Sequence, residues 1–99
     1  MQEEKLTPID PGEVLVEEFL TPMGLSQDQL ARSLRVPIQR IKDVIHGKQG
    51  VTADTALRLA RYFDMSPQFW LGLQMDYDLD VAADALGERL ESEVVTLKS

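Results

Sequence analysis

The sequence predicts an all-α fold, and three observations support this prediction. Apolar residues recur at helical spacing along most of the chain, and residues that can cap a helix precede the apolar stretches. In the middle of the chain, two short helical patterns are separated by a turn of only three residues. A length of 99 residues with 43% apolar content is enough for one small domain with a single core.

The first predicted helix extends from about Pro11 to Leu20. Asp10 can cap this helix, and proline is well tolerated at the first helical position because its missing N–H would have no partner there. The carboxylate of Glu13 would then lie near the positive end of the helix dipole. The sequence TPMG at residues 21–24 is predicted to end the helix, since both proline and glycine interrupt helices.

The most specific pattern lies in the pair of short helices that follows. Ser26 and Gln29 have the S-x-x-Q spacing of a capping box, in which each side chain bonds a backbone N–H at the start of the helix. The first helix of the pair is therefore predicted from about Gln27 to Leu34. Pro37 disfavours helical geometry for the residue before it and suits the first turn of a second helix. Two such helices joined by a short turn form a helix-turn-helix.

The second helix of this pair has one polar and one apolar side when residues are placed about 100° apart around its axis. Ile41, Val44 and Ile45 lie on the apolar side, and Ile38 lies at its border. The polar side fits the major groove of DNA, where glutamine can pair with adenine, arginine or lysine with guanine, and an apolar residue can contact a thymine methyl group. The alternative is the solvated face of an ordinary amphipathic helix, which the preceding helix and the short turn argue against.

The charges are distributed unevenly along the chain. The net charge of −7 alone argues against a nucleic-acid partner, since phosphate binding depends on lysine and arginine. Residues 25–62, however, contain seven lysines and arginines against three acids, a net charge of +4, whereas the remainder carries −11. A basic middle with acidic ends suits a DNA surface on one side and a cationic partner on the other. The alternative role of the acidic ends is only to keep the protein soluble.

Two further helices are predicted after the helix-turn-helix. Thr52 can cap a helix from about Ala53 to Phe63, and Ser66 with Pro67 begins a helix that reaches about Tyr77. The apolar stripe of this last helix is predicted to belong to the core, with contact to a second copy of the chain as the alternative. Its members are Phe69, Trp70, Leu73 and Tyr77.

Beyond residue 80 the patterns are weaker. A helix interrupted by Gly87 is predicted, followed by a short β-prone tail from Val94 to Leu97. Such a tail can add a strand to the sheet edge of another protein, although tails of this kind are more often disordered.

Several kinds of chemistry find no support in the sequence. There is no cysteine, the single histidine, His46, has no catalytic or metal-binding companion at a suitable spacing, and no glycine-rich phosphate loop occurs. Asp76, Asp78 and Asp80 begin like a calcium loop, but Val81 stands where such a loop requires glycine. We therefore expect no enzyme activity, cofactor or metal. The chain has no apolar run of membrane-spanning length and no signal peptide, so a cytoplasmic location is expected.

Three groups of residues carry a resemblance to a known family. They are Pro11-Gly12-Glu13, the run GKQGVTADTALRLAR from Gly47 to Arg61, and Ser66-Pro67 followed by Phe69-Trp70-Leu71 and Leu73-Gln74. With them, residues 11–79 closely resemble the HigA-type antitoxins, also called VapI-like proteins, of the Xre superfamily. This resemblance is much more specific than a helix-turn-helix alone.

The resemblance implies a five-helix Xre domain of the lambda-repressor type at residues 10–80, with a flexible N-terminal arm at residues 1–9 and a C-terminal extension at residues 81–99. It also implies a homodimer that binds palindromic operator DNA, represses its own operon and neutralises a HigB toxin, a RelE-like ribosome-dependent mRNA endonuclease. Two other functions stay open, namely a stand-alone Xre regulator without a toxin and a protein-interaction module with weak DNA binding.

The resemblance further implies roles for individual residues on DNA. Those that would read bases are Ile38, Gln39, Arg40, Lys42 and Asp43, and those that would approach phosphates are Gln27, Arg35, His46, Lys48 and Thr52. Two positions depart from the family pattern. Arg35 occupies a turn position that is usually glycine, so either the turn differs or the arginine is kept for a phosphate, and Leu71-Gly72-Leu73 replaces the usual Leu-Asn-Leu.

Overall fold

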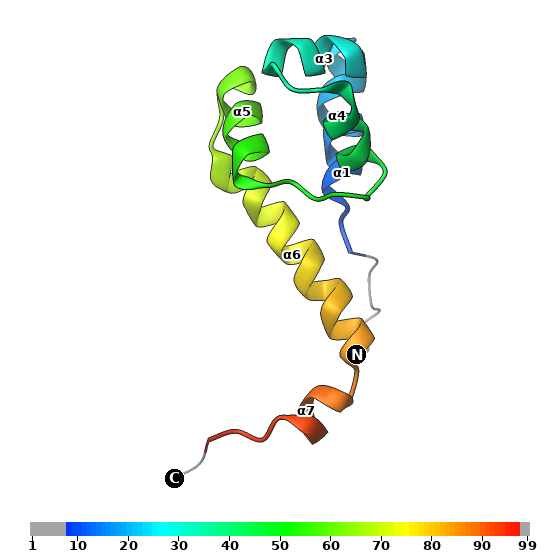
Figure 1. Ribbon diagram of the computed structural model, residues 1–99, viewed down its shortest axis with the longest axis vertical. Coiled ribbons are helices and arrows are strands. Elements are labelled where there is room, and N and C mark those ends of the chain that lie inside the picture. The colour runs from blue at the N-terminus through cyan, green and yellow to red at the C-terminus, as the bar shows by residue number, and fades with distance from the viewer. Residues whose placement is uncertain (1–7, 98–99) are drawn as a thin grey trace.

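The computed structural model describes residues 8–97, and every regular element in that span is helical (Figure 1). This confirms the predicted all-α fold class. In chain order the elements are α1 (Pro11–Val14), η1 (Leu15–Leu20), α2 (Thr21–Met23), α3 (Gln27–Leu34), α4 (Ile38–Ile45), α5 (Ala53–Phe63), α6 (Pro67–Leu86) and α7 (Arg89–Glu93). Among the described residues, no helix is both long and apolar enough to span a membrane.

The elements α1, η1 and α2 follow one another without a break and form the first helix of the fold. Asp10 caps it as predicted, because its carboxylate accepts a hydrogen bond from the Gly12 N–H at 2.9 Å. The predicted end at Leu20 was wrong, since the helix continues through α2 and ends at Gly24, which has a φ of 66°. η1 is a π-helix, and its wider turn makes room for Pro22, whose ring would otherwise collide with a carbonyl of the preceding turn.

The pair α3 and α4 forms the predicted helix-turn-helix. The capping box is present, because Ser26 Oγ accepts from the Gln29 N–H at 3.0 Å and Gln29 Oε1 accepts from the Ser26 N–H at 2.9 Å. Arg35 ends α3 in the left-handed conformation, with a φ of 61°. The turn therefore keeps the geometry that glycine favours. Pro37 occupies the N-cap position directly before α4, without a capping hydrogen bond from its side chain, instead of lying in the first turn of the helix.

The core lies where α3, α4, α5 and the first part of α6 pack together with the first helix. Its largest fully buried side chains are Leu15, Leu30, Ile41, Leu59 and Trp70. Phe19 packs against this core, with its ring centroid 5.1 Å from that of Trp70 and 4.7 Å from that of Phe63. The predicted aromatic stripe is therefore divided, because Trp70 is a core residue whereas Phe69 is 41% exposed.

α6 is longer than predicted, since it continues past Tyr77 to Leu86 and ends at Gly87. Residues 78–86 contain three alanines and two leucines, which are strong helix formers, so the three aspartates in the same stretch do not end the helix. The interruption at Gly87 was predicted correctly, and α7 follows it. In Figure 1 the second half of α6 extends away from α3, α4 and α5 and leads to α7, and the overall extents are 53 × 31 × 23 Å.

The two ends of the chain bear on the predicted domain organisation. Residues 1–7 of the predicted arm lie outside the described residues. The predicted boundary at residue 80 falls within α6, so the division into residues 10–80 and 81–99 stays a prediction. Residues 94–97 form neither helix nor strand, and the predicted β-prone tail has no sheet partner within residues 8–97.

Candidate nucleic-acid interface

The polar side of α4 carries most of the predicted base-reading residues. Gln39 and Lys42 are exposed, Asp43 is half-buried, and Ile38 packs against the edge of the core. Gln39 Nε2 donates a hydrogen bond to Asp43 Oδ1 at 2.8 Å. One amide hydrogen and the amide oxygen of Gln39 remain for other partners. The structure thus brings Gln39 and Asp43 together, and the carboxylate of Asp43 orients the glutamine.

Arg40, the remaining predicted base-reading residue, bonds to α5 instead of standing free on α4. Its Nη1 donates to Asp54 Oδ2, and the same oxygen accepts from Arg58 Nε at 2.9 Å. Arg58 Nη1 also donates to the Leu34 carbonyl at 2.8 Å, which satisfies one of the carbonyls left open at the end of α3. This Arg40–Asp54–Arg58 cluster links three helices, α3, α4 and α5.

The two arginines also determine the charge state of Asp54. The hydrogen bond from Arg40, followed by that from Arg58, holds the pKa of the Asp54 carboxyl below its ordinary value. Asp54 is therefore fully ionised at neutral pH. The stability that the lowered pKa contributes is present above about pH 4 and is lost as the pH falls through the lower pKa of the folded state.

Two of the predicted phosphate-binding residues lie at helix N-termini. Gln27 is the first residue of α3, and Thr52 caps α5, where its hydroxyl accepts from the Thr55 N–H at 3.3 Å. Backbone N–H groups at such ends favour an anion. The placement is therefore compatible with a phosphate contact at the start of each helix.

The other three predicted phosphate-binding residues are exposed around the two ends of α4. Arg35 lies in the turn before this helix, and His46 ends it. Lys48 is fixed beside α4 because its N–H donates to the Asp43 carbonyl at 2.8 Å. These predicted phosphate contacts are thus distributed around the helix that carries the predicted base readers.

Known proteins are similar to this chain in sequence and in fold. The helix-turn-helix family model matches residues 16–70, which is more than half of the chain. Virulence-associated protein I of Dichelobacter nodosus is 53% identical over 74 residues, which cover 75% of this chain and 68% of that protein. The structure of the Pseudomonas aeruginosa antitoxin HigA with the higBA promoter has a TM-score of 0.87 at 44% identity, covering 92% of this chain and 99% of that one. This chain belongs to the HigA-type antitoxins of the Xre helix-turn-helix family.

The likeness of this HigA-type chain to known structures includes its C-terminal part. The structure of antitoxin GraA in complex with its operator matches over the full length of both chains, with a TM-score of 0.88 and 38% identity. The shared fold therefore extends beyond the helix-turn-helix and through the long helix α6.

Two residues of the candidate interface in this HigA-type chain, Asp54 and Arg58, are not evident as site residues from the sequence. Their spacing of four residues on one helix is a signal that predicts their pairing with each other. The pairing of Asp54 with Arg40 depends instead on how α4 packs relative to α5, which no local sequence pattern reports.

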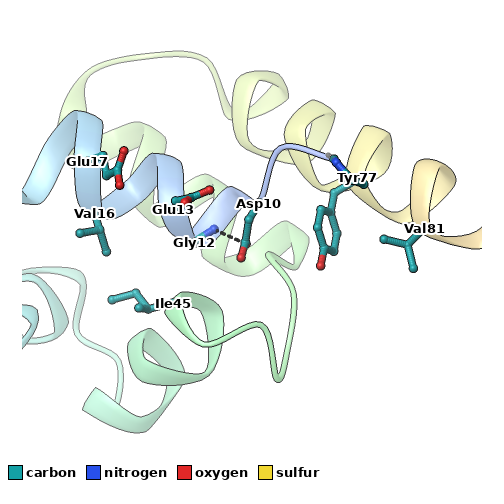
Figure 2. A pocket seen from close by; sticks show the side chains of 9 residues that line it. Asp10, Gly12, Glu13, Val16, Glu17, Ile45, Tyr77 and Val81 are labelled. Carbon is teal, nitrogen blue, oxygen red and sulfur yellow. Dashed lines mark hydrogen bonds between the residues drawn. The ribbon is translucent and has the colours of Figure 1, made fainter. Parts of the chain in front are cut away.

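A hollow of about 520 Å³ lies between the first helix, the end of α4 and the middle of α6 in this HigA-type chain (Figure 2). Asp10 lines the hollow, and its carboxylate is already engaged in capping the first helix. Glu13 and Glu17 also line it, and both are exposed and have no ion-pair partner within residues 8–97. The apolar part of the lining includes Val16, Ile45, Tyr77 and Val81. No three potential metal ligands gather here or elsewhere in the described part of the chain. The combination of carboxylates and apolar side chains suits a basic partner.

Proposed function

We propose that this chain is a DNA-binding antitoxin that acts in the cytoplasm and represses its own operon by binding operator DNA through α4. The observation that carries the proposal is the exposed polar side of α4 within a helix-turn-helix, where Asp43 orients Gln39. Two related antitoxins support it, because their structures contain promoter or operator DNA.

In this proposal α4 reads bases, and the segments around it contact phosphates. The base readers are Ile38, Gln39, Arg40, Lys42 and Asp43, and the phosphate contacts are Gln27, Arg35, His46, Lys48 and Thr52. The base contacts supply sequence preference, whereas the phosphate contacts supply affinity and orientation. Asp43 contributes through its bond to Gln39.

Gln39→Ala and Lys48→Ala test these two roles separately. Gln39→Ala is expected to weaken binding to the operator by about 1–3 kcal/mol and to relax the preference at one position per half-site, because a base-edge contact is lost. Lys48→Ala is expected to weaken binding to every sequence and to lower the slope of the salt dependence by about one unit, because a phosphate contact is lost. Titrations of operator and random duplexes at several salt concentrations measure both effects.

Equal losses on operator and random DNA for both variants would contradict the division into base and phosphate contacts. Asp43→Ala serves as an additional check on the glutamine. A variant that binds all DNA more tightly with unchanged sequence preference would show that Asp43 only repels phosphates and does not act through Gln39.

Arg35→Gly is expected to stabilise the fold and to weaken DNA binding at the same time. The left-handed conformation costs a non-glycine residue roughly 1 kcal/mol, and glycine removes that cost at some loss of backbone entropy. Asp64→Gly is the matched control, because Asp64 also has a positive φ, 57°, but is an acid at the end of α5, outside the proposed DNA contacts. Thermal unfolding and DNA titration should show stabilisation of both variants and weaker DNA binding of Arg35→Gly alone. An unchanged DNA affinity would remove Arg35 from the phosphate contacts.

We further propose that the protein is a homodimer, in which two α4 helices contact two operator half-sites about 34 Å apart. The second half of α6 is the best candidate for the interface. It exposes Leu79, which is 61% accessible, and Met75, which lies just before this half of the helix, is 56% accessible. Residues 78–85 of this half are all exposed, and a helical segment with few tertiary contacts is only marginally stable in water, so a second copy of α6 would stabilise it.

The proposed toxin partner is a HigB-like, RelE-type mRNA endonuclease, which must bind polyanionic RNA and is therefore expected to be basic. The acids around the hollow in Figure 2 and those on α6 and α7 lie outside the proposed DNA contacts, so opposite charge would steer the two proteins together. Coexpression with the product of the adjacent reading frame tests the proposal. A small basic protein that co-purifies with this chain would support it, and the absence of such a frame would favour a stand-alone regulator.

A further inference from the structure

We propose that Asp54 on α5 is a positioning residue for Arg40, and that it contributes to operator specificity without contacting a base itself. This inference rests on the proposed DNA-binding function. It assigns part of the sequence specificity to α5, whereas α4 is the helix proposed to read bases in the major groove of DNA.

Asp54 is held from both sides by arginines. Its Oδ2 accepts from Arg40 Nη1 and, at 2.9 Å, from Arg58 Nε. Arg58 is itself fixed, because its Nη1 donates to the Leu34 carbonyl at 2.8 Å at the end of α3. The carboxylate that receives Arg40 is therefore anchored to both α5 and α3, and the guanidinium of Arg40 has a defined direction before any DNA is present.

The bond to Asp54 leaves most of the guanidinium of Arg40 available. Only Nη1 is engaged, and no other hydrogen bond from this group is found in the part of the chain that the structure describes. The side chains of Arg40 and Asp54 are 37% and 54% exposed to solvent. An edge formed by Nε and Nη2 thus remains for two parallel hydrogen bonds, which is the arrangement that guanine O6 and N7 accept from arginine.

The alternative is that the ion pair only stabilises the fold. Exposed ion pairs contribute little to stability, so this role alone would be small. On charge alone, an acid in the basic middle of the chain weakens binding to any DNA, whatever its sequence. A positioning role makes a different prediction, because a long flexible side chain that is already oriented loses less freedom when it bonds a base.

The test uses the full chain and two DNA probes, a duplex that the wild-type protein selects from a randomised pool and a random duplex of equal length. Asp54→Asn is expected to lower the preference for the selected base by about fivefold at the position that Arg40 reads, while affinity for random DNA rises. Asp28→Asn is the matched control, because both acids are the second residue of a helix, α3 or α5. The control should also bind random DNA more tightly, but with unchanged base preference.

Arg40→Ala and the double variant Arg40→Ala/Asp54→Asn complete a mutant cycle. In the absence of Arg40, the Asp54 substitution should have no further effect on base preference. An equal effect in both backgrounds, or an Asp54→Asn variant that behaves like Asp28→Asn, would overturn the positioning role. If Arg40→Ala leaves every base preference intact while Gln39→Ala does not, the positioning role fails and the DNA-binding function stands. If the wild-type protein selects no duplex, both fail.

Discussion

Replacing Gly12 by alanine is expected to destabilise the protein by about 3 kcal/mol, the upper end of the usual cost of overpacking. A Cβ at this position would lie 2.8 Å from Ile45 Cα and from the Ile45 carbonyl oxygen, and closer still to the Val44 carbonyl oxygen. These are backbone atoms at the end of α4, so rotation of a side chain cannot relieve the collision and α1 must move away from α4. In a domain of this size, such a loss lowers the melting temperature by roughly 12–24 °C.

Gly72→Ala is the matched control for Gly12→Ala. Gly72 lies within α6, and a Cβ there would meet no atom within 4 Å. Alanine should therefore raise the free energy of unfolding by about 0.5–1 kcal/mol, because glycine loses more conformational freedom in a helix. Thermal unfolding of both variants checks the pair of predictions. A Gly12→Ala protein as stable as the wild type would show that α1 and α4 do not approach this closely.

The second large effect is expected from Leu79→Glu, which should convert the proposed dimer into a monomer. Leu79 is 61% exposed on α6, so the glutamate remains solvated in an isolated chain and leaves its fold intact. Against a second copy of α6, the same glutamate would place an unpaired charge in an apolar contact. A dimer links two half-site contacts, whereas a monomer makes only one, so affinity for the complete operator should fall about 100-fold or more.

Sedimentation velocity and operator titration measure the two consequences of Leu79→Glu. Val95→Glu is the control, because it adds the same charge to an apolar residue that is 80% exposed beyond α7. Both variants should bind a duplex with a single half-site as the wild type does. A Leu79→Glu protein that remains dimeric would place the interface on another surface.

The features of this fold that can be predicted from the sequence depend on neighbouring residues. The Asp10 cap, the capping box at Ser26 and the helix end at Gly87 each involve a few adjacent positions, and all three are present. The errors arise where a local rule is outweighed by its surroundings. A π turn accommodates Pro22 within the first helix, and helix-forming neighbours carry α6 through its aspartates.

For the candidate site, the sequence predicts which residues are exposed around α4 but not how they pair. The bond between Gln39 and Asp43 follows from their spacing on one helix, whereas the bond between Arg40 and Asp54 joins two helices. The requirement for glycine at position 12 is equally non-local. Gly12 belongs to one of the motifs that resemble the family, but the backbone atoms that leave no room for a side chain lie at the end of α4. The roles of these residues on DNA stay predictions.

Trp70 provides the protein with an intrinsic optical reporter. It is the single tryptophan of the chain, its side chain is fully buried, and its ring centroid lies 5.1 Å from those of Phe19 and Phe69. An indole in such apolar surroundings fluoresces at shorter wavelength than one in water. Since Phe19 belongs to η1 and Trp70 to α6, a shift of the emission to longer wavelength reports that these elements have separated. The fluorescence of Trp70 can therefore distinguish, without any added label, a variant that has lost its fold from one that has lost only its contacts with DNA.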